Sequence, residues 1–509
     1  MPTLKYTGHP FVDVGVATIT AFSKKLHPEE VTDEDLEQVA DFIEWNYVRP
    51  PLRGHLTMAF TSNGWFIQPA FDPERPGLSP EKKKELKATR TQWAFRHLRQ
   101  WQPTTIPSAE QCIFTGDPAL ATNLSDSLQE GRVGRSQMPL LQGDVSINFF
   151  AAGDPGLPIS GLALLALQFF PLGCAKCGVG LLAAHSDNER LNYQITNRFF
   201  QHNIKALAEV QAAGGEKFPK APQSLKTLLV DTLLEIERDR SDAEQDEEPA
   251  SLTAYNFNNG KTPDVALYHL RLEVMSFLLA AQNTMYQGAW GQLAKRGWQL
   301  PRPKKGKGEQ TDIEGVQESR RNYLYEDLFD LPREAKRFIR TYFLRVPKRT
   351  SFEEDPRRKY SLRSEQQLVS WPLVELFLRS VVHMEQDRIA GIRTLGDNLA
   401  VYIRKQGGQG KRFFRDFFTE QRPSYFRERL IKANIAHIKD GYPPLFDMGS
   451  YIDVFEEGDE VMRSDWRLAR DLVYMRMIDQ LKDWIAQNPE ALPEPEPEGE
   501  AILTRAPEE

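Results

Sequence analysis

The sequence predicts an α+β protein, in which a mixed α/β N-terminal domain precedes an all-α helical bundle. Patterns typical of strands occur up to Leu270, and amphipathic helical patterns dominate from Leu272 onward. Two short cysteine segments interrupt the first half of the chain. With 509 residues, the chain is long enough to bury several hydrophobic cores.

Two helices of the N-terminal domain can be placed by their capping residues. Thr32 and Asp35 form a capping box, which predicts a helix over the residues that follow. The apolar face of this helix consists of Leu36, Val39, Ala40 and Ile43. Ser79 is the expected N-cap of a second, strongly basic helix, because Pro80 suits a first helical turn.

Strands are expected in two places. Leu56–Phe60 and Trp65–Gln68 flank a Thr-Ser-Asn-Gly turn. Leu252–Phe257 and Val265–Leu270 flank the sequence Asn258-Asn-Gly-Lys261, which is typical of a tight hairpin turn.

The remaining pattern is mainly helical and sets the expected domain organisation. The longest apolar stretch, Ile159–Leu172, is too short to span a bilayer and predicts a buried helix. Residues 190–234 have a helical pattern, and residues 238–250 form a charged linker. We therefore expect an α/β domain over 1–275, a basic helical region over 276–380, a helical bundle over 381–488 and a disordered acidic tail over 489–509.

Charge is unevenly distributed, although the formal net charge is only −7. Acidic residues concentrate in 235–248 and 489–509, whereas residues 302–432 carry a clear excess of Lys and Arg. A basic block of this kind favours a polyanionic partner. Three cysteines cannot form a disulfide framework, and the first residues lack a signal-peptide pattern, so we expect a cytoplasmic protein without a membrane segment.

The cysteine segments have the form of two zinc-ribbon turns. Cys174 and Cys177 form a C-x-x-C-G sequence, and Cys112 begins a similar segment in which Thr115 stands where a fourth thiolate is expected. Zinc is therefore one candidate cofactor, with His185 or water as the fourth ligand. The alternative is a degenerate zinc-ribbon-like insertion that keeps its turns through packing and hydrogen bonds without a metal.

Several polar and basic segments are candidates for contact with nucleic acid. Two loops carry side chains able to reach base edges or phosphates: Asn258, Asn259 and Lys261 in the first, and Arg132, Arg135 and Gln137 in the second. A competing interpretation of the first loop is that Asn-Gly only forms the hairpin turn. Further candidates for holding the phosphate backbone are Lys304, Lys305, Lys307, Arg333, Arg337, Arg340 and Arg345.

Motifs of the common enzyme classes are missing from the sequence. It contains no P-loop, no H-E-x-x-H and no G-x-S-x-G. We therefore expect a protein without catalytic residues. The alternatives are a nuclease whose active site is not recognisable from sequence, and a scaffold whose basic half meets an acidic protein.

The order of these features resembles one family, the large subunit of the type I-B CRISPR interference complex (Cascade), which is known for a pair of C-x-x-C motifs. The matching segments are residues 7–15 (Thr-Gly-His-Pro-Phe-Val-Asp-Val-Gly), 112–116, 147–150 (Ile-Asn-Phe-Phe), 162–172, 174–178 and 255–259. The resemblance covers about residues 1–275 through motifs, and beyond them only length and helical character agree.

The resemblance implies a non-catalytic subunit that sits beside the 5′ handle of the guide CRISPR RNA. Such a subunit recognises the protospacer-adjacent motif in double-stranded target DNA, assists R-loop formation and stabilises the displaced strand. Its implied partners are the backbone, handle-binding and small subunits of Cascade, and a helicase-nuclease or transposition proteins. The family's C-terminal region is also made separately as a small subunit by internal translation, for which Met384 would be the start here.

Overall fold

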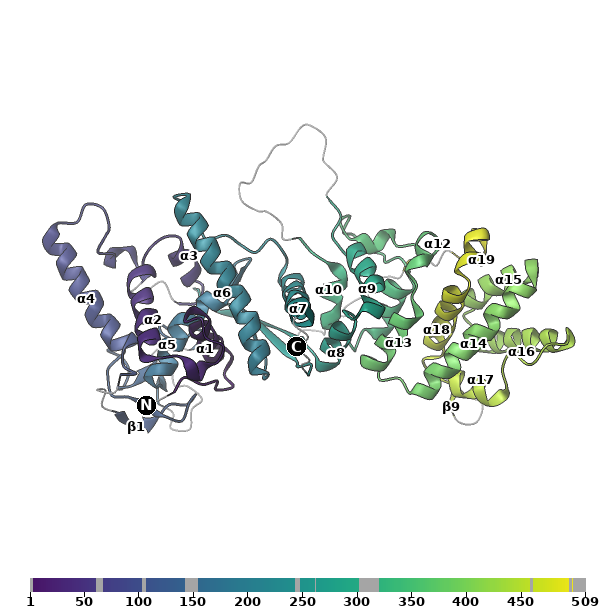
Figure 1. Ribbon diagram of the computed structural model, residues 1–509, viewed down its shortest axis with the longest axis horizontal. Coiled ribbons are helices and arrows are strands. Elements are labelled where there is room, and N and C mark those ends of the chain that lie inside the picture. Colours follow the sequence, from purple (N-terminus) through teal and green to yellow (C-terminus); the bar gives the residue numbers. More distant parts are fainter. Residues whose placement is uncertain are drawn as a thin grey trace, which may run out of the picture. The chain divides into compact units, whose positions relative to one another are not determined.

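The computed structural model describes residues 3–60, 67–102, 107–141, 154–242, 248–260, 262–301, 320–457, 461–493 and 497 (Figure 1). Its many helices and small antiparallel sheets confirm the α+β class. The chain divides into two compact units, Met1–Leu270 (unit 1) and Arg271–Glu509 (unit 2). None of the described helices is long and apolar enough to cross a membrane.

Unit 1 is built around two helices that are buried on nearly all sides. These are α1 (Pro10–Phe22) and α5 (Gly161–Phe169), which pack against each other. Their contact is close, because a Cβ at Gly15 would lie 2.1 Å from the carbonyl oxygen of Ala166. The burial of α5 confirms the helix predicted from the apolar stretch of the sequence.

The outer helices of unit 1 are α2 (Asp33–Asn46), α4 (Pro80–Leu98), α6 (Glu189–Ala212) and α7 (Leu225–Asp242). The first two begin where their capping residues predict. The backbone N–H of Asp35 donates to the Thr32 hydroxyl (3.2 Å), and the Thr32 N–H donates back to the Asp35 carboxylate (2.9 Å). Ser79 caps α4 in the same way, since its hydroxyl accepts from the N–H of Lys82 (3.2 Å).

A four-stranded antiparallel sheet completes unit 1. Its strands β5 (Ala175–Cys177), β6 (Gly180–His185), β7 (Leu252–Asn258) and β8 (Asp264–Leu270) are paired in sequence order. The pairs Leu252–Leu270 and Asn258–Asp264 confirm the predicted hairpin of the last two strands. There are two smaller strand pairs: β1 (Pro107–Gln111) with β2 (Pro118–Leu120), which flank the segment of Cys112, and β3 (Arg132–Val133) with β4 (Leu157–Pro158).

The first predicted strand pair is wrong where the structure describes it. Leu56 ends the short helix α3 (Leu52–Leu56), and the chain then turns through Phe60. Leu56, Ala59 and Phe60 are all buried, so this short apolar run fills the core from a helix and a turn instead of a strand. Within the second run, Ile67 and Gln68 lie outside any strand, and residues 65–66 are outside the described residues.

Unit 2 is helical, as predicted. Its larger helices are α8 (Leu272–Ala280), α9 (Thr284–Arg296), α13 (Trp371–Ser380), α14 (Gln386–Lys405), α15 (Gly407–Thr419), α16 (Pro423–Lys439), α17 (Met448–Phe455), α18 (Trp466–Gln480) and α19 (Lys482–Gln487). Helix α14 packs along α18, with α15 and α17 against them (Figure 1). A short hairpin, β9 (Glu456–Glu457) with β10 (Val461–Met462), precedes α18.

Two predicted irregular segments are more ordered than expected. Helix α7 extends through residue 242 into the predicted charged linker. At the start of the predicted tail, Pro489–Ala491 forms a 3-10 turn, Leu492 is fully buried and Lys411 pairs with Glu490 (2.7 Å). The prediction of disorder from residue 489 is therefore wrong for these first residues, because Leu492 supplies an apolar anchor.

Candidate nucleic-acid interface

Asn259, a predicted reader of base edges, is part of the fold. Its side chain is fully buried and its amide donates to the carbonyl oxygen of Ala59 (2.9 Å). Its Oδ1 accepts from the Arg135 guanidinium (3.1 Å). The expectation that Asn259 contacts DNA is therefore corrected, because its side chain is buried; Arg135 is only half-buried, and its bond to Asn259 helps to hold the hairpin turn on the rest of unit 1.

Asn258 is also used within the turn. Its amide donates to the carbonyl oxygen of Val179 (3.0 Å), and its Oδ1 accepts from the N–H of Gly260 (3.0 Å). These bonds support the interpretation of the Asn-Gly sequence as a structural turn. Lys261, the third candidate in this loop, lies outside the described residues.

Arg132 and Gln137 of the second loop are buried as well. The Arg132 guanidinium donates to the Glu110 carboxylate through two nitrogens, at 2.6 and 3.1 Å. The Gln137 amide donates to the carbonyl oxygen of Leu124 (3.2 Å), while its Oε1 accepts from the N–H of Gly134 (3.2 Å). The prediction that these side chains reach phosphate is corrected, because both are committed to closing the loop.

The predicted zinc ligands are buried free thiols. Cys174 lies just before β5, and its thiol donates to the carbonyl oxygen of Phe170 (3.4 Å). Burial raises the pKa of the Cys177 thiol to about 12 and that of Cys174 well above its usual range. Among the residues that the structure describes, no group of three or more His, Cys, Asp or Glu side chains is placed to hold a metal ion.

The side chains at the positions expected for a fourth zinc ligand, Thr115 and His185, form hydrogen bonds within the fold. The Thr115 hydroxyl lies 3.3 Å from the Ser160 hydroxyl and accepts from the N–H of Asp117 (3.2 Å). His185, the alternative ligand, instead has its Nε2 at 3.0 Å from the Asp13 carboxylate. The described residues therefore do not fit a zinc site built on Cys112, Cys174 and Cys177.

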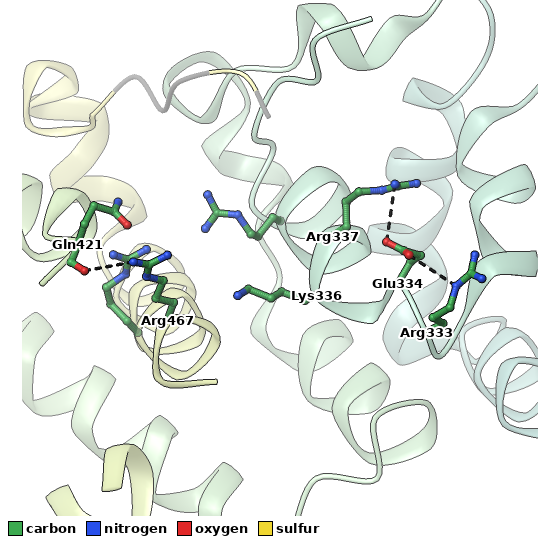
Figure 2. Close-up of a pocket in the computed structure, with 8 residues that line it drawn as sticks. Arg333, Glu334, Lys336, Arg337, Gln421 and Arg467 are labelled. Atoms are coloured by element: carbon green, nitrogen blue, oxygen red, sulfur yellow. Dashed lines mark hydrogen bonds and ion pairs between the residues drawn. The ribbon is translucent and has the colours of Figure 1, made fainter. Parts of the chain in front are cut away.

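Unit 2 contains a cleft of about 380 Å³ in which cationic side chains predominate (Figure 2). We call it the basic cleft. Its lining consists of Arg333, Glu334, Lys336, Arg337, Arg340, Gln421, Arg467 and Arg470. Six of these eight side chains are cationic and one is acidic, so the lining favours an anionic ligand.

Three segments position these side chains. One wall is formed by the end of a loop, by α11 (Ala335–Phe338) and by the π-helix Ile339–Phe343, which continues α11 directly. The opposite wall is α18, where Arg467 and Arg470 are one turn apart, and Gln421 comes from the connection between α15 and α16. π-helical turns are rare and occur frequently at functional sites.

Apolar residues of the first wall anchor it in the core of unit 2. Phe338, Tyr342 and Phe343 are buried, and the ring of Phe338 stacks on that of Phe377 with centroids 5.2 Å apart. This alternation of buried aromatics with cations explains why Lys336, Arg337 and Arg340 are held at the cleft instead of being spread around an exposed helix.

The charges of the cleft are only partly neutralised. Asp471 is fully buried and pairs with Arg340 and with Arg470, the latter at 2.8 Å. Glu334 lies 3.6 Å from both Arg333 and Arg337. Among the described residues that line the cleft, six are cationic and Glu334 is the one acid, so the lining carries an excess of positive charge.

Lys336 and Arg467 differ from the other cations of the basic cleft. Within the described part of the chain, Lys336 and Arg467 form no ion pair with a carboxylate. Arg467 donates instead to the backbone oxygen of Gln421 (3.3 Å). Figure 2 shows Lys336 pointing from its wall toward Arg467, with the Arg333–Glu334–Arg337 group on its other side.

The structure brings together three of the predicted phosphate-binding residues, Arg333, Arg337 and Arg340. It does not add Arg345, whose fully buried guanidinium donates to Glu365 (2.9 Å). The expectation for Arg345 is corrected, because this arginine is a core ion pair. The predicted residues Lys304, Lys305 and Lys307 lie outside the described residues.

Sequence reasoning did not single out Lys336, Gln421, Arg467 or Arg470. Lys336 belongs to the basic run that contains Arg333 and Arg340, and its exposure distinguishes it only once the helix is folded. A signal for Arg467 and Arg470 exists in their spacing of three residues on a predicted helix. Nothing in the sequence places that helix opposite residue 336.

No model of a known protein family matches the chain. A search of curated proteins likewise finds no match to its sequence.

Proposed function

We propose that the protein binds nucleic acid through the basic cleft. The observation that carries this proposal is the lining of the cleft, where six cations stand against one carboxylate among the described residues, and where Lys336 and Arg467 form no ion pair with a carboxylate in that part of the chain. Guanidinium groups suit phosphate, because their planar array of donors bonds phosphate oxygens in pairs. Most of the affinity for nucleic acid comes from such backbone contacts and is independent of base sequence.

We further propose that this binding serves a non-catalytic large subunit of a type I-B CRISPR RNA-guided complex in the cytoplasm. This finer proposal rests on the motif order of residues 1–275, and its partners are guide RNA, double-stranded target DNA, the other Cascade subunits, and a helicase-nuclease or transposition proteins. In such a complex base pairing reads the target sequence while the protein holds backbone and the displaced strand. The basic cleft has the charge that the second task requires.

The test is the salt dependence of DNA binding by Lys336→Gln and Arg467→Gln. Each variant should weaken binding to single-stranded and duplex DNA alike and should lower the slope of log K against log salt by roughly one unit for each phosphate that the replaced cation neutralises. Fluorescence anisotropy at several salt concentrations measures both quantities. Lys439→Gln on α16 is the matched control, because it removes the same charge from an exposed site of unit 2 outside the cleft.

Equal slopes for wild type and both cleft variants would overturn the proposal. An equal loss of affinity and salt slope in the Lys439→Gln control would indicate that DNA binds outside the cleft. Cleavage of either DNA by the purified protein with added Mg²⁺ would favour the nuclease alternative, and absence of any binding to DNA would favour the protein scaffold.

A further inference from the structure

A second cleft of unit 2 adds an aromatic ring to the cations. Its volume is about 540 Å³, and its lining includes Lys295, Trp298, Lys359, Gln292 and Gln367. We call it the Trp298 cleft. None of its lining residues belongs to the basic cleft, so it forms a separate site.

The backbone on both sides of Trp298 is fixed by hydrogen bonds. Helix α9 ends at Arg296, and the Gly297 carbonyl oxygen accepts from the N–H of Tyr323 (2.8 Å). On the other side, the N–H of Gln299 donates to the carbonyl oxygen of Arg321 (2.8 Å). Trp298 therefore stands on a short extended segment that is paired along its length.

The indole ring is held in place without being buried. The Arg320 guanidinium lies 4.7 Å from its centroid, and the ring of Tyr325 meets it edge-on at 6.3 Å. The side chain remains only half-buried and lines the cleft. Because Arg320 lies over one face of the ring, a base stacks on the opposite face, and the fixed ring keeps the cost in conformational entropy low.

The charge of the Trp298 cleft is positive. Among the described residues on its lining, Glu365 is the one acid, and it is already engaged by Arg345 (2.8 Å) and Arg296 (3.5 Å). Lys295 and Lys359 form no ion pair with a carboxylate in the part of the chain that the structure describes. Two ammonium groups are thus free beside a fixed aromatic ring.

We infer that the Trp298 cleft binds an unpaired nucleotide, with its base stacked on Trp298 and its phosphate held by Lys295 and Lys359. Every base has a π-face, so stacking on an aromatic side chain is tolerant of sequence. The amides of Gln292 and Gln367 supply donors and acceptors for a base edge. The inference rests on the proposed function and makes it more specific: of the nucleic acids, it selects a single strand.

The test compares two single strands that carry the same phosphates, an oligothymidylate of about 12 nucleotides and its abasic counterpart. Stacking of one base corresponds to roughly tenfold or more in affinity, so the wild-type protein should bind the thymine strand at least that much more tightly. Trp298→Leu should bring the ratio of the two affinities close to one, and Trp298→Phe should preserve most of it. Far-ultraviolet circular dichroism verifies that both variants are folded.

A control variant and a competition experiment show where the stacked base binds and whether it must belong to a strand. Tyr425→Leu is the matched control, because Tyr425 is an exposed aromatic of unit 2 whose ring also carries an arginine, Arg422, at 3.7 Å. Competition with adenosine monophosphate asks whether a free nucleotide also occupies the cleft. Displacement of the strand from the wild-type protein but not from Trp298→Leu assigns the cleft to free nucleotides as well as strands. No displacement restricts it to nucleotides within a strand.

The ratio of the affinities for the thymine strand and the abasic strand tests this inference separately from the proposed function. Equal binding of both strands by the wild-type protein overturns the stacking site and leaves phosphate binding by the basic cleft intact. Binding of neither strand overturns both. Loss of the ratio in Tyr425→Leu, with Trp298→Leu unaffected, places the stacked base elsewhere and overturns the assignment to Trp298.

Discussion

Arginine and lysine side chains of one short basic region of unit 2 have opposite roles, which depend on what lies behind each of them. Arg345 is fully buried, donates to Glu365 and has its guanidinium 3.3 Å from the centroid of the Tyr360 ring. Burial raises the pKa of Tyr360 to about 12, so this ring stays a neutral phenol. Lys336 is exposed and pairs with no carboxylate among the described residues. The first side chain stabilises the fold, and the second is available to a ligand.

These roles predict opposite effects for two substitutions. Arg345→Gln should lower the free energy of unfolding by about 3–5 kcal/mol, because it removes the buried partner of Glu365 and leaves only the longer contact with Arg296 (3.5 Å). Lys336→Gln should leave stability within about 0.5 kcal/mol, since it changes an exposed site. Urea denaturation followed by circular dichroism measures both. The assignment would be contradicted by an Arg345→Gln protein of normal stability that has a reduced affinity for DNA.

At the scale of elements, the sequence is sufficient to place a helix where capping residues fix its first turn. Thr32 with Asp35, and Ser79 with Pro80, place two helices correctly, because these residues bond the first free N–H groups of the helix itself. Leu56–Phe60, predicted as a strand, forms a helix end and a turn, since a short apolar run fits a strand or a helix end equally well.

The basic cleft was only half predictable for a different reason. Arg333, Arg337 and Arg340 stand in one visible run, but the opposite wall lies far along the chain: Arg340 and its partner Asp471 are 131 residues apart. Similarly, Arg132 and Asn259 look like polar loop residues in the sequence, and only their tertiary partners show that they are buried. Segment patterns contain no information about such pairings.

The packing of α1 on α5 gives a prediction at this scale. Gly15→Ala should destabilise unit 1 by about 1–3 kcal/mol or more, because the added methyl group would overlap the Ala166 carbonyl and force the two helices apart. Gly54→Ala in α3 is the control, since a Cβ there meets nothing within 4 Å and alanine favours a helix. Thermal unfolding of both variants measures the difference, and equal melting temperatures would contradict the close packing.

At the scale of the whole molecule, two kinds of evidence fall on different units. The motifs that resemble the Cascade large subunit lie within residues 1–275, almost entirely in unit 1, although residues 147–150 are outside the described residues. The basic cleft and the Trp298 cleft both belong to unit 2. Each unit has its own buried core, so substitutions on the surface of one should leave the other folded.

This separation predicts that assembly and strand binding can be uncoupled. The tagged wild-type chain, purified from its native host, should carry a uniform short RNA with a common 5′ handle together with backbone-forming CRISPR subunits. The double variant Lys336→Gln/Arg467→Gln should retain this RNA and these partners, because it changes only the basic cleft of unit 2. The same complex should bind target DNA more weakly and with a smaller salt slope. RNA sequencing and mass spectrometry identify the bound components. Wild-type protein that carries neither RNA nor such subunits would refute the large-subunit proposal. The two clefts would then be explained by another role in binding single strands.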